Sequence, residues 1–194
     1  DVREFLLVTA VLRELNPKVC DAMQSETDSA AMLAYLKRQD LFVVETGRNT
    51  LRNHHIFHDF LRQQSTPSLR QSWDRRAAGY YLKEDKPESA IYHLIEAGAW
   101  EDVAGLLDSY ASTLLAIGRL DTLSAYIDAL PPEILIQHPG LVFTLGELTR
   151  LHSRFDEALG WYVQAENIWR SHGQQDGIAR ALRGQARVFL DTVN

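Results

Sequence analysis

Three stretches of the first 40 residues place their apolar side chains at the spacing of a helix face. Residues 2–12 form the first stretch. Asn16 before Pro17 is a typical helix start and predicts a second helix over 17–23, because proline fits the first helical turn. Asp28-Ser29 predicts the cap of a third helix over 30–38. The residues expected on the buried faces of the second and third helices are Val19, Cys20, Met23, Met32, Leu33 and Leu36.

The pattern then changes to β-branched and aromatic residues. Residues 41–45 and 50–53 flank the turn cluster Gly47-Arg48-Asn49, which predicts two short strands. A fourth helix is expected from His54 or His55 to Gln64, carrying the apolar residues Ile56, Phe57, Phe60 and Leu61. Three helices, a ribbon and a helix are the ingredients of a winged-helix domain. We place that domain at 1–65.

Residues 66–194 show only the helical period, in units of roughly 12–16 residues. Short units separated by turns predict paired antiparallel helices, so we expect a helical-repeat domain over 66–194 that is truncated at its C-terminus. The whole chain is therefore predicted to be mainly α. The expected breaks are Asp85-Lys86-Pro87, Ala97-Gly98-Ala99, Gly118-Arg119, Pro131-Pro132, His138-Pro139-Gly140, His152-Ser153-Arg154 and His172-Gly173.

Small and aromatic residues recur in the helical part at the spacing of a tetratricopeptide unit. Gly146, Ala158, Tyr162 and Ala165 match its small, aromatic and small positions. The same phase returns at Ala90, two repeats of about 34 residues earlier. Small residues let the facing helices of a hairpin approach closely. The small positions of the less regular units are Ser112, Ser124, Ala181, Gly184 and Ala186.

Composition narrows the possible functions. The chain has 194 residues and a net charge of −6, which disfavours a general nucleic-acid binder. The single Cys20 rules out an internal disulfide and a multi-thiolate zinc site. No apolar run approaches the roughly 18 residues of a membrane span, and no signal-peptide pattern is present, so we expect a cytoplasmic protein without membrane contact. Because Asp1 already enters a helical pattern, we expect a piece of a longer protein.

Residue patterns for catalysis are missing from the sequence. There is no G-x-x-x-x-G-K-[ST] phosphate loop, no G-x-S-x-G elbow and no carboxylate pair in an apolar setting. We therefore predict no catalytic residues, no resident cofactor or metal, and no enzymatic activity for this chain.

Several strings, in their order and spacing, resemble one protein family: the central region of the large MalT-type, LuxR-family ATP-dependent transcriptional activators, which belong to the signal-transduction NTPases. The resemblance covers essentially the whole chain. The strings are Phe5-Leu6-Leu7, Asn16-Pro17-Lys18-Val19-Cys20-Asp21-Ala22, Leu41-Phe42-Val43-Val44, His54-His55-Ile56-Phe57-His58-Asp59-Phe60-Leu61-Arg62, Arg76-Ala77-Ala78, Ala90-Ile91-Tyr92-His93, Gly98-Ala99-Trp100-Glu101 and Ile127-Asp128-Ala129-Leu130-Pro131.

The resemblance implies a domain order. In that family a P-loop ATPase precedes the winged helix, and a tetratricopeptide-like sensor superhelix and a DNA-binding helix-turn-helix follow. ATP or ADP is then expected in the full-length protein, and the upstream ATPase domain of the same chain and an inducer or protein on the repeats are the expected partners. Helix 28–38 is expected to pack against the ATPase domain and not to read DNA, because Lys37 and Arg38 are its only basic residues.

The resemblance also implies a role for His54. In these NTPases a histidine at the start of the last winged-helix helix reaches the phosphates of bound ADP and helps to hold the inactive state. Asn53 departs from the aromatic residue that often precedes this histidine. Two other roles remain open for His54: packing or capping, and a metal site shared with His58 at the i, i+4 spacing.

The helical repeats offer candidates for a ligand or partner groove. We single out Trp161, Trp169 and Arg150; repeat packing is the alternative for the tryptophans and a solvated surface for the arginine. The leading functional hypothesis is a regulatory module that couples the nucleotide state of an ATPase domain to sensing by the repeats. The alternative is a generic tetratricopeptide-type scaffold without any link to nucleotide.

Overall fold

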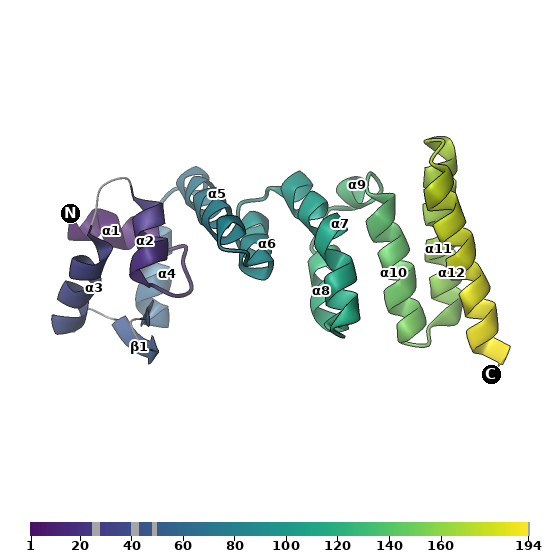
Figure 1. The fold of residues 1–194 in the computed structure, drawn as a ribbon. Helices are drawn as coiled ribbons and strands as arrows, with labels where there is room; N and C mark the ends of the chain where they lie inside the picture. The colour runs from purple at the N-terminus through teal and green to yellow at the C-terminus, as the bar shows by residue number, and fades with distance from the viewer. Residues whose placement is uncertain (25–27, 40–42, 48–49, 194) are drawn as a thin grey trace. The chain divides into compact units, whose positions relative to one another are not determined.

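Figure 1 shows the computed structural model, which describes residues 1–24, 28–39, 43–47 and 50–193. Within these ranges the chain forms twelve helices and one two-stranded sheet. It divides into two compact units, Asp1–Ala99 and Trp100–Asn194. The predicted mainly helical fold, with a small hairpin in its N-terminal part and packed helices after it, is confirmed. None of the helices in the described ranges is long and apolar enough to cross a membrane.

The first unit begins with the predicted helices. Their caps are as expected, because Asn16 Oδ1 accepts a hydrogen bond from the backbone N–H of Val19 at 3.1 Å and Asp28 Oδ1 accepts one from Ala31 at 3.0 Å. The first helix ends at Thr9, earlier than the apolar pattern over 2–12 suggested. These elements are α1 (Val2–Thr9), α2 (Pro17–Met23), α3 (Ser29–Arg38), β1 (Val43–Gly47), β2 (Thr50–Asn53) and α4 (His55–Gln63).

The hairpin is antiparallel, with Val43 opposite Asn53 and an irregularity between Glu45 and Gly47. The backbones of Leu15 and Leu51 exchange two hydrogen bonds of 2.7 and 2.9 Å, which join the hairpin to the segment before α2. Both leucine side chains are buried. The predicted strand and turn residues Leu41, Phe42, Arg48 and Asn49 lie outside the described residues.

Two further helices, α5 (Pro67–Lys83) and α6 (Pro87–Glu96), complete the first unit. Ala77 of α5 lies in the same hydrophobic core as the winged-helix residues. Arg76 Nη1 donates a hydrogen bond of 2.8 Å to the carbonyl of Met23 at the end of α2. The first helical hairpin therefore packs with the winged helix in one compact unit. The predicted boundary between a winged-helix domain ending at residue 65 and a helical-repeat domain beginning at residue 66 stays a prediction.

A buried polar pair joins α5 to α6. His93 Nδ1 lies 2.7 Å from Asp74 Oδ1, and both side chains are almost fully buried. The imidazole stacks on the ring of Tyr81, with 5.4 Å between the centroids and 7° between the planes. The second carboxyl oxygen of Asp74 has no hydrogen-bond partner among the described residues.

The second unit contains six helices whose limits fall at the predicted breaks. Gly118 and Gly173 adopt positive φ values of 73° and 68° in the turns after two of them, a conformation that glycine accepts without strain. The six are α7 (Trp100–Ala116), α8 (Leu120–Asp128), α9 (Pro132–Leu135), α10 (Pro139–Leu151), α11 (Phe155–Ser171) and α12 (Gln175–Val193).

The predicted small positions are buried at Ala90 of α6 and at most sites of α10 to α12, but not at three other sites. Gly146, Ala158 and Ala165 are buried, as is Tyr162. In contrast, Ser112 is exposed. Ser124 is half-buried, and Ala186 of α12 is exposed. In α7 the buried small residue is the neighbouring Ala111. A strict 34-residue repeat would bury the helix face that carries Ser112, but α7 buries an adjacent face instead.

Candidate functional site

His54 lies between the hairpin and α4, as the residue that caps the helix. Its side chain is exposed and makes no capping hydrogen bond, while its carbonyl accepts the N–H of His58 at 2.8 Å. The ring lies beside that of His55, with 4.4 Å between the centroids. The first turn of a helix carries N–H groups without intrahelical partners, and the helix dipole favours an anion there. A donor at this position can therefore bind a phosphate or carboxylate together with the helix end.

The residue before His54 is held inside the protein. Asn53 ends β2 with only 3% of its surface exposed, and neither amide atom has a hydrogen-bond partner among the described residues. Leu51, two residues earlier, is fixed by its backbone pairing with Leu15. The hairpin thus fixes where α4 begins and hence where the imidazole of His54 can reach.

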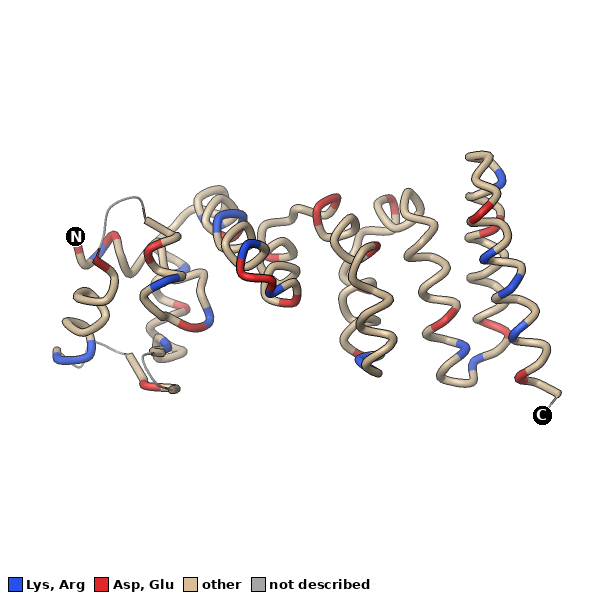
Figure 2. The backbone as a smooth tube through the Cα atoms, viewed as in Figure 1, with Lys and Arg blue, Asp and Glu red and all other residues tan. Residues whose placement is uncertain are grey.

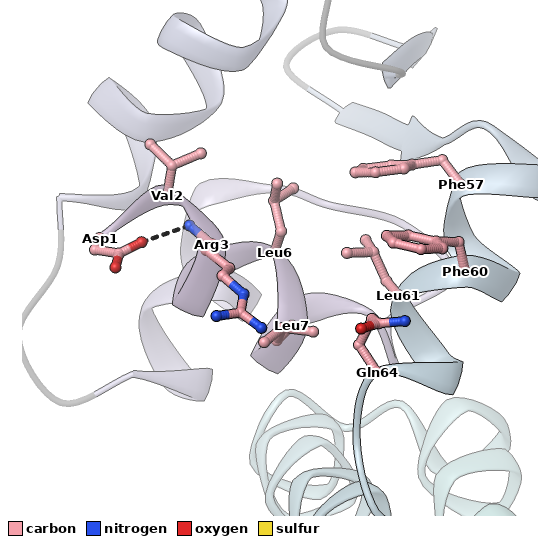
Figure 3. A pocket seen from close by; sticks show the side chains of 9 residues that line it. All are labelled: Asp1, Val2, Arg3, Leu6, Leu7, Phe57, Phe60, Leu61 and Gln64. Atoms are coloured by element: carbon pink, nitrogen blue, oxygen red, sulfur yellow. Dashed lines mark hydrogen bonds between the residues drawn. The ribbon is translucent and has the colours of Figure 1, made fainter.

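Part of the exposed side of α4 is apolar. Ile56 is 66% exposed and Phe60 52%, and with His54 and Phe57 they line an open groove of about 500 Å³. Of the four apolar residues predicted on this helix, only Leu61 is buried in the core. A second cavity, of about 520 Å³, lies between α1 and α4 (Figure 3). Its lining residues are Asp1, Val2, Arg3, Leu6, Leu7, Phe57, Phe60, Leu61 and Gln64.

The metal alternative for His54 and His58 stays a prediction. His58 Nδ1 lies 3.5 Å from Asp59 Oδ1; the side chain of His58 is half-buried and that of Asp59 is exposed. Across the described part of the chain, no three His, Cys, Asp or Glu side chains gather closely enough to hold an ion.

The other end of α4 is tied to the helical hairpin through Arg62. Its Nη2 donates to Glu96 Oε2 of α6 at 2.7 Å, and its carbonyl accepts from Arg70 Nη1 of α5 at 2.6 Å. Burial lowers the pKa of Arg62, but the hydrogen bond and charge of Glu96 outweigh it, so the pKa is raised overall. Sequence reasoning missed this ion pair, because its partners are 34 residues apart and each reads as a solvated charge.

In the second unit Arg150 is not simply solvated. It donates to Glu147 at 3.1 Å and to Asp191 at 2.8 Å, and its side chain is only 16% exposed. Tyr162 donates its hydroxyl proton to the other oxygen of Glu147 at 2.6 Å. Burial, then the bond to Glu147, raises the pKa of Tyr162. Arg150 is therefore part of a polar network that joins α10, α11 and α12.

The two tryptophans differ in exposure. Trp169 is 5% exposed and lies in a core cluster with Val142 and Ala181. Its burial agrees with the repeat-packing alternative, and Gly177 of α12 packs directly against its ring. Trp161 is half-buried and packs beside that cluster. A binding role for Trp161, Trp169 or Arg150 stays a prediction.

Charge on the winged helix is mixed. Figure 2 shows basic residues of α3 only at its C-terminal end, where Lys37 and Arg38 lie. Lys37 Nζ is 2.7 Å from Glu45 Oε2 of β1, so part of this charge is neutralised. The expectation that this helix does not read DNA stays a prediction.

With this geometry established, comparison with known proteins is informative. Residues 1–73 match the MalT winged helix domain. Over 97% of its length the chain is also similar to the HTH-type transcriptional regulator MalT of Cronobacter sakazakii, at 28% identity over 197 residues. The chain spans 22% of the length of that relative. The resemblance to MalT-type regulators, read from the sequence, is therefore confirmed as distant similarity over nearly the whole chain, and this MalT winged helix is the part that contains His54.

Proposed function

We propose that this chain is the regulatory middle of a MalT-like transcriptional activator. In this proposal the winged helix binds the nucleotide-loaded face of an ATPase domain in the same protein. The helical repeats bind an inducer or a protein partner, and the two events are coupled. The chain itself carries no catalysis; ATP or ADP belongs to the ATPase domain.

The exposed His54 at the start of α4 is the observation that supports this proposal. Its imidazole is not used by the fold, since it makes no capping bond and lies in solvent. It also lies at the N-terminus of α4, where the helix dipole favours a phosphate. A protonated or neutral imidazole donor there binds the ADP phosphates in addition to the ATPase domain's own contacts. Losing this bond weakens the ADP-bound state and shifts the population toward the open one.

The apolar surroundings of His54 fit a docked domain. Ile56 and Phe60 expose large apolar surfaces on the side of α4 where the histidine lies. A covered site would exclude water and strengthen a hydrogen bond to phosphate.

The packing of α10 to α12 favours a second candidate, the generic scaffold without nucleotide. Gly146 and Gly184 hold their helices against Tyr162 in the manner of stacked repeat hairpins, and such arrays bind protein segments. The two candidates differ in one feature, because only the first requires an ATPase domain in the complete protein.

The test uses the complete protein with bound ADP and the variant His54→Ala. An ADP dissociation rate raised about tenfold or more is expected, because a hydrogen bond to a charged group contributes about 1.5–3 kcal/mol. His55→Ala is the matched control, since His55 is equally exposed on the first turn of α4. Equal dissociation rates for wild type and His54→Ala would contradict the nucleotide role.

A further inference from the structure

The helix that begins beside His54 ends in a junction with the first helical hairpin. Arg62 lies eight residues after His54, which at 1.5 Å per residue places it about 12 Å along the axis. α4 is thus a single rigid element between the candidate nucleotide contact and the contact with α5 and α6.

Arg62 is bonded to both helices of the hairpin. Its guanidinium donates to Glu96 in the last turn of α6, and its carbonyl accepts from Arg70 of α5. Arg70 also donates to the carbonyl of Ser65. The carbonyl of Arg62 at the C-terminal end of α4 therefore accepts from a side chain of the hairpin as well as from Ser65. A displacement of α4 along its axis must stretch these bonds or move the hairpin.

The ion pair is partly shielded from water, with side-chain exposures of 27% for Arg62 and 31% for Glu96. Partial burial makes the pair sensitive to geometry, since a charge pulled away from its partner is poorly solvated there. A second cationic contact lies nearby in the same unit: the guanidinium of Arg13, from the segment between α1 and α2, lies 3.6 Å from the centre of the Tyr92 ring on α6. α6 is thus held to the winged helix at two separate points.

We propose that α4 transmits the nucleotide state to the helical repeats, with Arg62 and Glu96 as the positioning residues that move α6 with it. The winged helix and the α5–α6 hairpin then respond to nucleotide as one body, and the signal enters the repeats through α6. This inference rests on the proposed function, because it requires that nucleotide acts on the start of α4.

The experiment is amide hydrogen exchange of the complete protein with and without ADP, for wild type and Glu96→Ala. In wild type, ADP is expected to slow exchange in both α4 and α6. In Glu96→Ala the slowing is expected to persist in α4 and to be clearly reduced in α6, where the Arg13–Tyr92 contact remains. The charge-reversed pair Arg62→Glu with Glu96→Arg is expected to restore it. Glu84→Ala is the control, because Glu84 is an exposed carboxylate at the end of α5.

Two results would overturn the inference, and they differ in what else they overturn. If ADP slows exchange in α4 and α6 of Glu96→Ala as much as it does in wild type, the ion pair does not transmit the nucleotide state. The proposed function then still stands. If ADP leaves exchange in α4 of the wild type unchanged, the nucleotide role of the winged helix fails as well.

Discussion

The ring of Tyr162 lies directly against the backbone of Gly146. A Cβ atom added at position 146 would lie 2.5 Å from Cε1 of the ring, and one added at Gly184 would lie 2.7 Å from the same atom. Tyr162 is fully buried, so the ring has no free space to move into. The close approach of α10, α11 and α12 thus depends on two glycines that contact one aromatic ring.

Gly146→Ala is expected to lower the free energy of unfolding by about 1–3 kcal/mol, because the added methyl group overpacks a full core. Gly160→Ala in α11 is the matched control. Nothing lies within 4 Å of a Cβ at that position, and alanine is the better helix former, so no loss of stability is expected. Urea unfolding of both variants measures the difference. Equal stabilities would show that the Tyr162 contact does not limit the helix spacing.

Removing the hydrogen bond between His93 and Asp74 is expected to destabilise the first unit strongly. His93→Phe keeps a ring stacked on Tyr81 but leaves the buried carboxyl group of Asp74 without its partner. A buried group left without its hydrogen-bond partner costs about 1–3 kcal/mol, and more when it is charged. Asp59→Ala, which removes the exposed contact with His58, is expected to cost less than about 1 kcal/mol. A loss of the same small size for both variants in urea unfolding would mean that the buried pair contributes little.

Stability is expected to fall at alkaline pH. Burial, with a smaller effect of Asp21, raises the pKa of Cys20 from 9.0 to about 12, and burial likewise raises that of Tyr81 from 10.0 to about 12. Both groups are neutral when protonated, so the folded state holds their protons more tightly than the unfolded chain does. Their contribution is fully present below about pH 9 and is lost as the pH rises toward about 12.

The free energy of unfolding as a function of pH tests this expectation. In the wild type it should decline between about pH 9 and about pH 11. In Cys20→Ala the decline should be shallower, whatever the variant's stability at neutral pH. An unchanged slope in the variant would contradict the assignment of the effect to the Cys20 thiol.

Much of the fold could be predicted because its signals are local. The caps Asn16 and Asp28 and the breaks between the helices depend on residues adjacent in sequence, and the structure has them where the pattern placed them. The repeat spacing predicts Gly146 and Tyr162 as small and aromatic packing positions, and the structure packs one against the other. Ser112 shows the limit of that argument. The helix α7 buries Ala111 and exposes Ser112, and the turn residues at its ends do not reveal which face is buried.

The contacts between distant elements could not be predicted. Arg62 and Glu96, or Tyr162 and Glu147, become neighbours only through packing, and each is an ordinary polar residue in its own helix. Trp169 illustrates the same difficulty for burial, since its cover is supplied by Gly177 of the next helix. His54 was found only through family resemblance, and its geometry at the start of α4 is compatible with the predicted role.

The nucleotide content of the complete protein tests the central claim most directly. The protein is purified without added nucleotide and denatured, and the released adenine nucleotides are separated and quantified against the amount of chain. We predict about one ADP or ATP per chain, with a lower retained amount of ADP for His54→Ala than for His55→Ala. A complete protein that has no ATPase domain, or that retains no adenine nucleotide and binds none when it is added, would contradict the account.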